Sequence, residues 1–328
     1  MLRLNNNRIR EFSTILKRLK IPLDTFSDER YFPSQNEGQE IIAHYMFFMV
    51  AIDHRTSRPD RPFEGMIEGE FEHGADALYR LAMLKFRDDP DFFTPKRMKD
   101  ISISDVKKWL TIKEPKEITI PDPEIRAFLL RDAANKLNKL YNGSLLDLIN
   151  DSKGYLYSEL EGGFIERLHV FRAYEDPVEK KSFLLAKFLE RRNILIVKDK
   201  DNASVPVDNH LIRIAVRIGL VDVDKSIEKY FVAWENEADR YLDILIRLPI
   251  RRSYEIASKM AGLSPFALDD LLWMLGRKIC IRDSPRCDEG VIKVMNIKSC
   301  PFRDICEAYT KKEKLSWNEH YYYNTWYY

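Results

Sequence analysis

The stretch CIRDSPRCDEGVIKVMNIKSCPFRDIC, residues 280–306, holds all four cysteines of the chain. Six, twelve and five residues separate Cys280, Cys287, Cys300 and Cys306. Cysteines gathered in one window of an intracellular protein are more often metal ligands than disulfide partners. Structural zinc sites usually use two close C-x2-4-C pairs, and this stretch has none. A [4Fe-4S] cube accepts wider loops, so the spacing predicts an iron–sulfur site, with structural zinc or unliganded thiols as the alternative.

The composition is that of a folded, helix-rich protein. Of 328 residues, 45% are hydrophobic, 32% are charged and only 12 are glycine, so we expect amphipathic helices around a full core. The first residues lack the apolar centre of a secretory signal, and no apolar run approaches the roughly 18 to 20 residues that span a bilayer. We therefore expect a cytoplasmic protein. The formal net charge of +1 argues against a strongly basic nucleic-acid binder and leaves a local patch as the route to DNA.

Several elements can be placed from apolar periodicity and end signals. The strongly apolar run EIIAHYMFFMVAI, residues 40–52, predicts a buried helix. Residues 122–143 predict a helix that stops at Asn142 and Gly143. Another helix is predicted to begin after Asp208, as its N-cap, and to stop near Gly219. The segment before it, ILIVKDKDNASVPVDNH, predicts a small hairpin or an extended excursion.

The cysteine window, together with the residues before it, resembles a specific family. LGRKIC, residues 275–280, runs into the cysteine intervals as a Gly-Arg-x-x-Cys motif runs into C-x6-C-x2-C-x5-C in the endonuclease III branch of the helix-hairpin-helix (HhH-GPD) DNA glycosylases. The first and last intervals match, and twelve residues replace two in the middle. An insertion of this kind can loop out at modest entropic cost. The resemblance implies a [4Fe-4S] cluster held by Cys280, Cys287, Cys300 and Cys306.

The same resemblance implies the fold and its division. It indicates an all-α protein with two helical domains. The first is a central helical bundle with a degenerate helix-hairpin-helix, residues 41–200. The second combines residues 1–40 with residues 201–328 and carries the catalytic aspartate and the cysteine window.

The segment VPVDNHLIRIAVRIGL, residues 205–220, resembles the family's Val-Asp-Thr-His type motif at the head of a helix. The resemblance implies that Asp208 is the catalytic carboxylate, which activates water or stabilises the positive sugar as an N-glycosidic bond breaks. His210 matches by position and would orient the helix or touch the DNA backbone. A helix cap without catalysis remains the alternative for Asp208, because aspartate is a favoured N-cap.

The family's hairpin pattern, Leu-Pro-Gly-Val-Gly-x-Lys-Thr-Ala, finds its best match in EDPVEKKSF, residues 175–183. Pro177 and Glu179 replace the two glycines that let backbone N–H groups approach a phosphate. Lys181 falls where family members with lyase activity keep their Schiff-base lysine, so the resemblance implies imine chemistry there. Lys180 is a weaker candidate for DNA contact, and ordinary solvated lysines are the alternative.

Basic and aromatic residues outside these motifs are weaker candidates for nucleic-acid contact. Arg55, Arg58 and Arg61 follow the predicted buried helix, and Arg277 lies in the basic neighbourhood of the cysteine window. The tail SWNEHYYYNTWYY, residues 316–328, carries seven tryptophan and tyrosine rings. Such rings stack on unpaired bases or pack against the protein itself.

These expectations lead to one function and two alternatives. The first is a DNA N-glycosylase of base-excision repair, a monomer acting on damaged duplex DNA, with AP-lyase activity if Lys181 forms an imine. The second is an N-glycosidase for a modified nucleoside or nucleotide, similar to queuosine-salvage hydrolases, because the hairpin lacks its glycines. The third is a non-catalytic nucleic-acid binding protein of the same fold.

Overall fold

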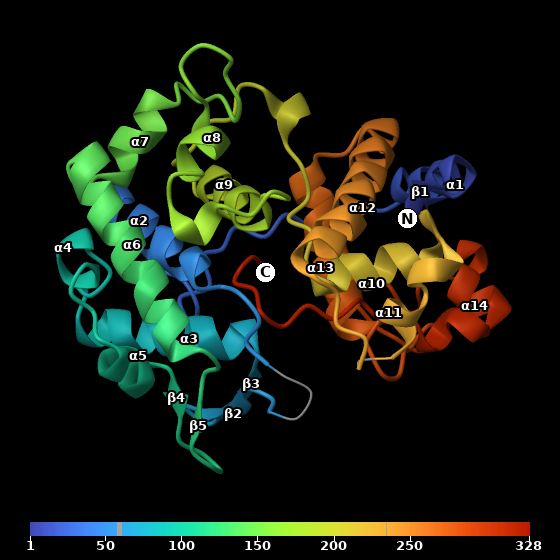
Figure 1. Ribbon diagram of the computed structural model, residues 1–328, viewed down its shortest axis with the longest axis horizontal. Coiled ribbons are helices and arrows are strands. Elements are labelled where there is room, and N and C mark those ends of the chain that lie inside the picture. Colours follow the sequence, from blue (N-terminus) through green and yellow to red (C-terminus); the bar gives the residue numbers. More distant parts are fainter. Residues whose placement is uncertain (58–60, 234) are drawn as a thin grey trace. The chain divides into compact units, whose positions relative to one another are not determined.

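The computed structural model describes residues 1–57, 61–233 and 235–328 (Figure 1). It is mainly helical, with 51% of residues in helix and three small two-stranded sheets in the described part of the chain. The expectation of a helical protein is confirmed, and the short β pairs were not predicted. Within the described residues, no helix combines the length and the apolar character needed to cross a membrane.

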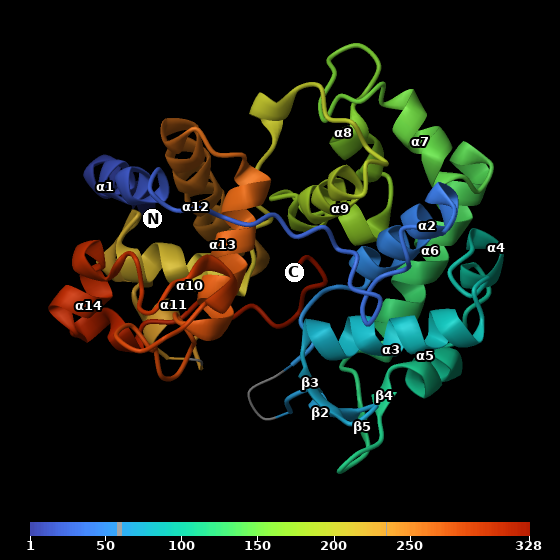
Figure 2. The same ribbon diagram turned by 180° about the vertical axis from the view of Figure 1, so that it is seen from behind.

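The chain divides into two compact units, which the figures show from opposite sides (Figures 1 and 2). Unit 1 comprises residues 1–24 and 203–324, and unit 2 comprises residues 25–202 and 325–328. These boundaries differ from the predicted ones at the first linker and at the tail. Residues 25–40 belong to unit 2 because the buried Arg192 side chain donates hydrogen bonds to the carbonyls of Phe26 and Pro33.

Unit 2 is built around one apolar helix, α2 (Gln39–Ala51), in which every residue from Ile42 to Ala51 is buried. A helix without a polar face is stable only when other elements surround it, and α6, α7 and α9 pack against α2. The other elements of unit 2 are β2 (Glu64–Ile67), β3 (Glu70–His73), α3 (Ala75–Asp88), α4 (Pro95–Met98), α5 (Ile103–Trp109), β4 (Thr111–Ile112), β5 (Ile118–Thr119), α6 (Pro123–Tyr141), α7 (Leu145–Asp151), α8 (Phe164–Leu168) and α9 (Lys180–Arg191).

Unit 1 combines the N-terminal arm with the C-terminal half of the chain. Its elements are β1 (Leu2–Leu4), α1 (Asn6–Leu16), α10 (Asn209–Ile218), β6 (Val221–Val223), α11 (Lys229–Val232), α12 (Arg240–Ala261), α13 (Pro265–Lys278) and α14 (Glu307–Lys311). The antiparallel pairing of β1 with β6 joins the arm to this half, and α1 lies along α12. Figure 2 shows α10 between α13 and α14, both of which contact it.

The predicted helix ends follow from local chemistry and are confirmed. Helix α6 ends at Tyr141, and Asn142 adopts the left-handed conformation that terminates it. Helix α10 begins after Asp208, whose Oδ1 accepts a hydrogen bond from the Leu211 N–H at 3.1 Å, and it ends at Gly219 with φ of 87°. Of the two possibilities predicted before α10, a small hairpin and an extended excursion, the second is confirmed. That segment is an extended excursion with one 3-10 turn, because the side chains of Val205 and Val207 are buried by packing rather than paired in strands.

Candidate functional site

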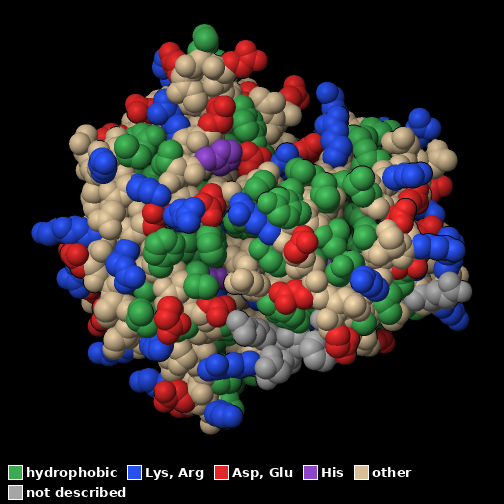
Figure 3. Space-filling view, viewed as in Figure 1, with side chains coloured by type: hydrophobic (Ala, Val, Ile, Leu, Met, Phe, Trp, Pro, Cys, Tyr) green, Lys and Arg blue, Asp and Glu red, His purple; other side chains and the backbone are tan. Residues whose placement is uncertain are grey.

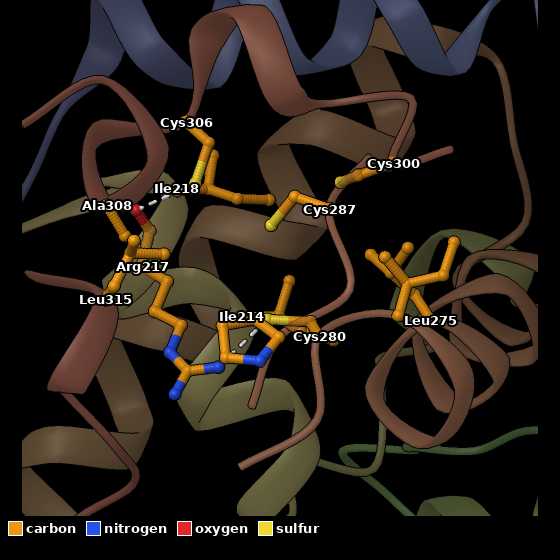
Figure 4. A pocket seen from close by; sticks show the side chains of 12 residues that line it. Ile214, Arg217, Ile218, Leu275, Cys280, Cys287, Cys300, Cys306, Ala308 and Leu315 are labelled. Carbon is orange, nitrogen blue, oxygen red and sulfur yellow. Dashed lines mark hydrogen bonds between the residues drawn. The ribbon is translucent and has the colours of Figure 1, made fainter. Parts of the chain in front are cut away.

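The four cysteines converge around one pocket in unit 1, although they are spread over 27 residues of sequence. Figure 4 shows their side chains around a common space, which has an empty volume of about 350 Å³ including its part open to solvent. The residues that complete the lining come from α10, α13, α14 and the adjoining loops: Ile214, Arg217, Ile218, Leu275, Ile279, Pro285, Ala308 and Leu315. The pocket is therefore apolar apart from its thiols and one arginine.

The cysteine loop, residues 280–306, turns back on itself between Cys287 and Cys300. Ile292 and Ile297 form an antiparallel bridge with hydrogen bonds in both directions, and both side chains are buried. This closure brings Cys287 and Cys300 together, and the Cys300 N–H donates to the Cys287 carbonyl at 2.8 Å. The long middle interval thus loops out without separating the two cysteines.

Three of the four thiols lie in surroundings that disfavour the thiolate unless a cation is present. Burial raises the pKa of Cys300 far above its ordinary value and the pKa of Cys306 to about 11. The pKa of Cys287 is raised by burial and by the nearby Cys280 sulfur. Backbone N–H groups of Phe302 and Tyr309 oppose the effect by donating to the Cys300 and Cys306 sulfurs. A bound metal supplies the positive charge that such a set of thiolates needs.

The donor set indicates which metal group fits. Among the described residues, no three His, Cys, Asp or Glu side chains lie as a single metal ion requires. A zinc ion with four ligands at about 2.3 Å would need all four sulfurs close together around one point. A [4Fe-4S] cluster is larger and binds each thiolate at a different iron, and the four cysteines that line this pocket are the residues that would hold it.

Two buried arginines of α10 connect this helix to the cysteine loop. Arg213 donates to the carbonyls of Cys280 (2.9 Å) and Gly276 (3.2 Å) and forms an ion pair with Glu319 at 2.6 Å. One turn further, Arg217 donates to the Ile281 carbonyl at 2.8 Å. Sequence reasoning missed both residues, although their spacing of four in an otherwise apolar helix places them on one face.

Asp208 and His210 lie at the start of the same helix. Asp208 is half-buried and caps α10, as both interpretations of the residue require. The His210 Nδ1 lies 2.8 Å from Nη2 of Arg213, and the His210 side chain packs against Gly276 of α13. A Cβ at Gly276 would lie 2.7 Å from the His210 Cβ, so only glycine fits there. His210 therefore has a packing role between α10 and α13.

Lys181 lies in unit 2, where it is fully buried rather than solvated. Its Nζ donates to the Ala51 carbonyl at 2.6 Å and lies 3.5 Å from Nδ1 of His54. Burial lowers the pKa of Lys181 well below its ordinary value, and the neighbouring charge of Lys180 lowers it further. Lys180 is also buried, with its Nζ 3.5 Å from an Asp53 carboxylate oxygen. Neither residue is the exposed lysine that the alternative interpretation assumed.

Three cations converge on the C-terminal end of α2. Besides the two lysines, Arg126 of α6 donates to the carbonyls of Ile52, His54 (3.2 Å) and Arg55 (3.0 Å). Burial lowers the pKa of Arg126 to about 10. The last carbonyls of a helix are without partners inside the helix and carry partial negative charge, so buried cations stabilise them. Sequence reasoning missed Arg126, because an arginine in an amphipathic helix normally faces solvent.

In the predicted hairpin at residues 175–183, the Asp176 side chain binds the backbone N–H groups of the turn. The buried Asp176 carboxylate accepts hydrogen bonds from the N–H groups of Val178 and Lys180, both at 3.0 Å. Glu179, which has a φ of 60°, accepts a hydrogen bond from the Tyr157 hydroxyl at 2.7 Å. The N–H groups that would hold a phosphate in the resembled family are therefore bound to a carboxylate here.

Arg277 and Arg55 have partners within the protein. Arg277 stacks on the ring of Trp273, with its guanidinium carbon 4.5 Å from the ring centroid. Arg55 is half-buried, and its N–H donates to the main-chain oxygen of Tyr328 at 3.0 Å. Arg58 lies outside the described residues. On the face shown in Figure 3, described basic and acidic side chains are interspersed rather than gathered by sign.

The aromatic tail packs against the protein itself. In unit 1, the Trp317 ring stacks on Phe231 with centroids 6.2 Å apart. In unit 2, Trp326 donates through Nε1 to the Arg172 carbonyl at 2.9 Å, and Tyr327 and Tyr328 are buried. These contacts follow the self-packing interpretation of the tail rather than the base-stacking one.

Comparison with known proteins adds no relative. No protein-family model matches the chain, and no curated protein matches its sequence.

Proposed function

We propose that this protein is an N-glycosylase that removes a damaged base from DNA, with Asp208 as its catalytic carboxylate and a [4Fe-4S] cluster in the cysteine loop. One observation carries the proposal. Four cysteines with unusual spacing converge on a pocket lined by α10, the helix that begins at Asp208. The same combination of cysteine loop and aspartate-headed helix is what the sequence resembles in the endonuclease III branch.

Cleavage of an N-glycosidic bond requires two properties of Asp208, its position and its negative charge. As the C1′–N bond breaks, its electron pair leaves with the base and positive charge develops on the sugar. The dipole of a helix favours negative charge at its N-terminus, where the Asp208 carboxylate lies. Asp208 would stabilise the sugar cation and accept a proton from the water that adds to C1′. A cluster on Cys280, Cys287, Cys300 and Cys306 would supply a cross-link of the loop rather than hydrolysis.

Lys181 extends the proposal to AP-lyase activity. A buried lysine whose pKa is lowered gives up its proton readily, and its amine then adds to the aldehyde of an abasic sugar. The resulting imine permits β-elimination of the strand. Borohydride would trap the imine as a covalent complex that Lys181→Met cannot form.

A second candidate, an N-glycosidase for a free modified nucleoside, is favoured by the closed hairpin. Asp176 occupies the N–H groups of Val178 and Lys180, and Glu179 adds a second carboxylate in the same turn. Carboxylates repel a phosphate backbone, so this turn lacks the N–H groups with which the resembled family binds a DNA phosphate. A free nucleoside has no phosphate to bind, and the catalytic role of Asp208 would be unchanged.

The test compares Asp208→Asn with a matched control. Asp239 caps α12 in the same unit and accepts a hydrogen bond from the Leu242 N–H at 2.8 Å. Asp208 caps α10 in the same way and accepts from the Leu211 N–H at 3.1 Å. Asparagine preserves both caps, so Asp239→Asn reports the loss of a capping charge alone. Anaerobically purified protein, assayed for iron and sulfide, is incubated with duplexes carrying uracil, 8-oxoguanine or an oxidised pyrimidine, and with free modified nucleosides.

Each outcome selects a function. Base release from duplexes that falls at least 100-fold in Asp208→Asn, but not in Asp239→Asn, supports the DNA glycosylase. Release from free nucleosides alone supports the salvage enzyme. Release from neither substrate, with nucleic-acid binding unchanged in Asp208→Asn, would contradict both and leave a binding protein.

A further inference from the structure

The segment after α2 places a histidine beside the candidate imine lysine. His54 is fully buried, and its Nδ1 lies 3.5 Å from Lys181 Nζ. A protonated lysine has no acceptor capacity, so Nδ1 must be the accepting nitrogen when Lys181 carries its full charge. The His54 hydrogen is then on Nε2. That atom is buried and has no hydrogen-bond partner within the described residues.

An unpartnered buried N–H is costly, and a structural histidine would avoid it. A capping role for Lys181 needs only the Ala51 carbonyl, which the amine already contacts at 2.6 Å. The histidine is therefore not required to hold Lys181 in place. Its position beside the amine has a chemical explanation, because a neutral imidazole is the side chain best suited to take a proton near neutral pH.

We propose that His54 is a catalytic residue of this protein, the base that takes the proton from Lys181 Nζ when the amine adds to an aldehyde. This inference rests on the imine chemistry of the proposed function and assigns a residue to it that no motif in the sequence indicates.

The step balances with groups already present. The Lys181 amine forms a bond to the aldehyde carbon, and the π electrons of the carbonyl move to its oxygen. The nitrogen, now positively charged, gives one proton to His54 Nδ1, and His54 passes it to the alkoxide to complete a carbinolamine. The hydroxyl then leaves as water with a proton from solvent, and a protonated imine remains on Lys181.

The charges around the pair favour this direction of transfer. Burial lowers the pKa of His54, and Arg126 and Lys181 lower it further, so the resting imidazole is neutral and able to accept. Lys180 and Arg126 also disfavour charge on Lys181, while Asp53 and Asp176 favour it. When Lys181 loses its proton, one of the cations that oppose protonation of His54 disappears. The two groups therefore exchange a proton more easily than either would with solvent.

The experiment uses formaldehyde with cyanoborohydride, which converts an imine on lysine to a methylamine and needs no nucleic acid. Cleavage after Glu179 and Glu190 releases a peptide, KKSFLLAKFLE, that contains Lys180, Lys181 and Lys187. Fragmentation in a mass spectrometer gives the methylation rate of each lysine in the same peptide. Lys187 is buried with its Nζ 5.2 Å from the Phe26 ring centroid, so it serves as the buried lysine outside the His54 contact.

The expected result is specific to one lysine and to pH. In His54→Asn, which keeps an acceptor but cannot take a proton, methylation of Lys181 should fall at least tenfold at pH 7, and the deficit should close by pH 9. Rates at Lys180 and Lys187 should not change. Equal Lys181 rates in wild type and variant, a deficit that is the same at every pH, or no methylation of Lys181 in folded wild type would overturn the proposal.

A second variant and a second substrate separate this inference from the proposed function. His54→Gln should give the same lysine-specific deficit, and a thermal melt within about 3 °C of wild type shows that both variants fold. Borohydride trapping on an abasic duplex then tests the proposed AP-lyase activity alone. Trapping that is absent while the formaldehyde result holds would reject AP-lyase activity on DNA and keep the role of His54 beside Lys181.

Discussion

The link between α10 and the cysteine loop can be tested by Arg217→Met, which removes the guanidinium and preserves most of the side-chain length. Arg217 is 2% exposed and makes four hydrogen bonds shorter than 3 Å. Its acceptors are the carbonyls of Trp317 (2.7 Å), Ile281 (2.8 Å) and Arg282 (2.6 Å) and the Asn318 side chain (2.9 Å). At about 1 kcal/mol net for each bond, the substitution should destabilise unit 1 by about 4 kcal/mol.

Calorimetric unfolding measures this loss. For a unit of this size, each kcal/mol lowers the melting temperature by about 3 to 4 °C, so the transition of unit 1 should fall by roughly 12 to 16 °C. The iron content of the purified protein should fall with it, because Arg217 holds the loop beside Cys280, whose sulfur lies 3.6 Å from Nη1. The control is Arg303→Met in the same loop, whose pairs with Asp288 and Asp304 are exposed and should contribute less than about 1 kcal/mol. A melting shift for Arg217→Met no larger than that of the control would refute the reasoning.

Three other substitutions probe the packing, the hairpin and the buried ion pair. Gly276→Ala places a methyl group 2.7 Å from the His210 Cβ and should destabilise the protein by about 1 to 3 kcal/mol in urea, whereas Gly69→Ala, with no atom within 4 Å, tests only the positive φ. Asp176→Ala removes the two carboxylate bonds of the hairpin and should cost about 2 to 3 kcal/mol, and a cost below 0.5 kcal/mol would contradict the hairpin assignment. Burial alone would raise the pKa of Glu319, but Arg213 lowers it to about 2, below its unfolded value of 4.5. The stabilisation, about 3 kcal/mol, is therefore present above pH 4.5 and lost as pH falls toward 2, and Glu319→Gln should flatten urea midpoints across that range.

The helix ends could be predicted because their causes are local. The stop at Asn142 and the cap at Asp208 depend on residues within a few positions of each other. The segment before α10 was predicted only as one of two possibilities, since Val205 and Val207 alternate like strand residues but are buried outside any strand. The pairing of β1 with β6 joins residues more than 200 positions apart, and three-residue strands leave no periodic signal.

The candidate site was predictable only where a residue type is rare. Four cysteines in one window indicate their own convergence, and the structure places all of them on one pocket. Arginine and histidine carry no such signal. Arg126 contacts main-chain carbonyls of the segment after α2, and His54 contacts the Lys181 amine of α9, and one sequence cannot show either contact. The sequence pattern of α10 held a usable hint, because Arg213 and Arg217 are four residues apart on an otherwise apolar helix.

The position of the cysteine loop argues that it stabilises α10 rather than touching substrate. Its thiols face an apolar pocket lined by the second half of α10, whereas Asp208 is the N-cap at the opposite end of that helix. The arginines between them bind main-chain carbonyls of the loop, so any metal held there would fix the helix through Arg213 and Arg217. Removal of the metal should then lower the melting temperature of unit 1 and the Asp208-dependent rate together. Methylation of Lys181, which depends on groups of unit 2, should remain unchanged in the same sample.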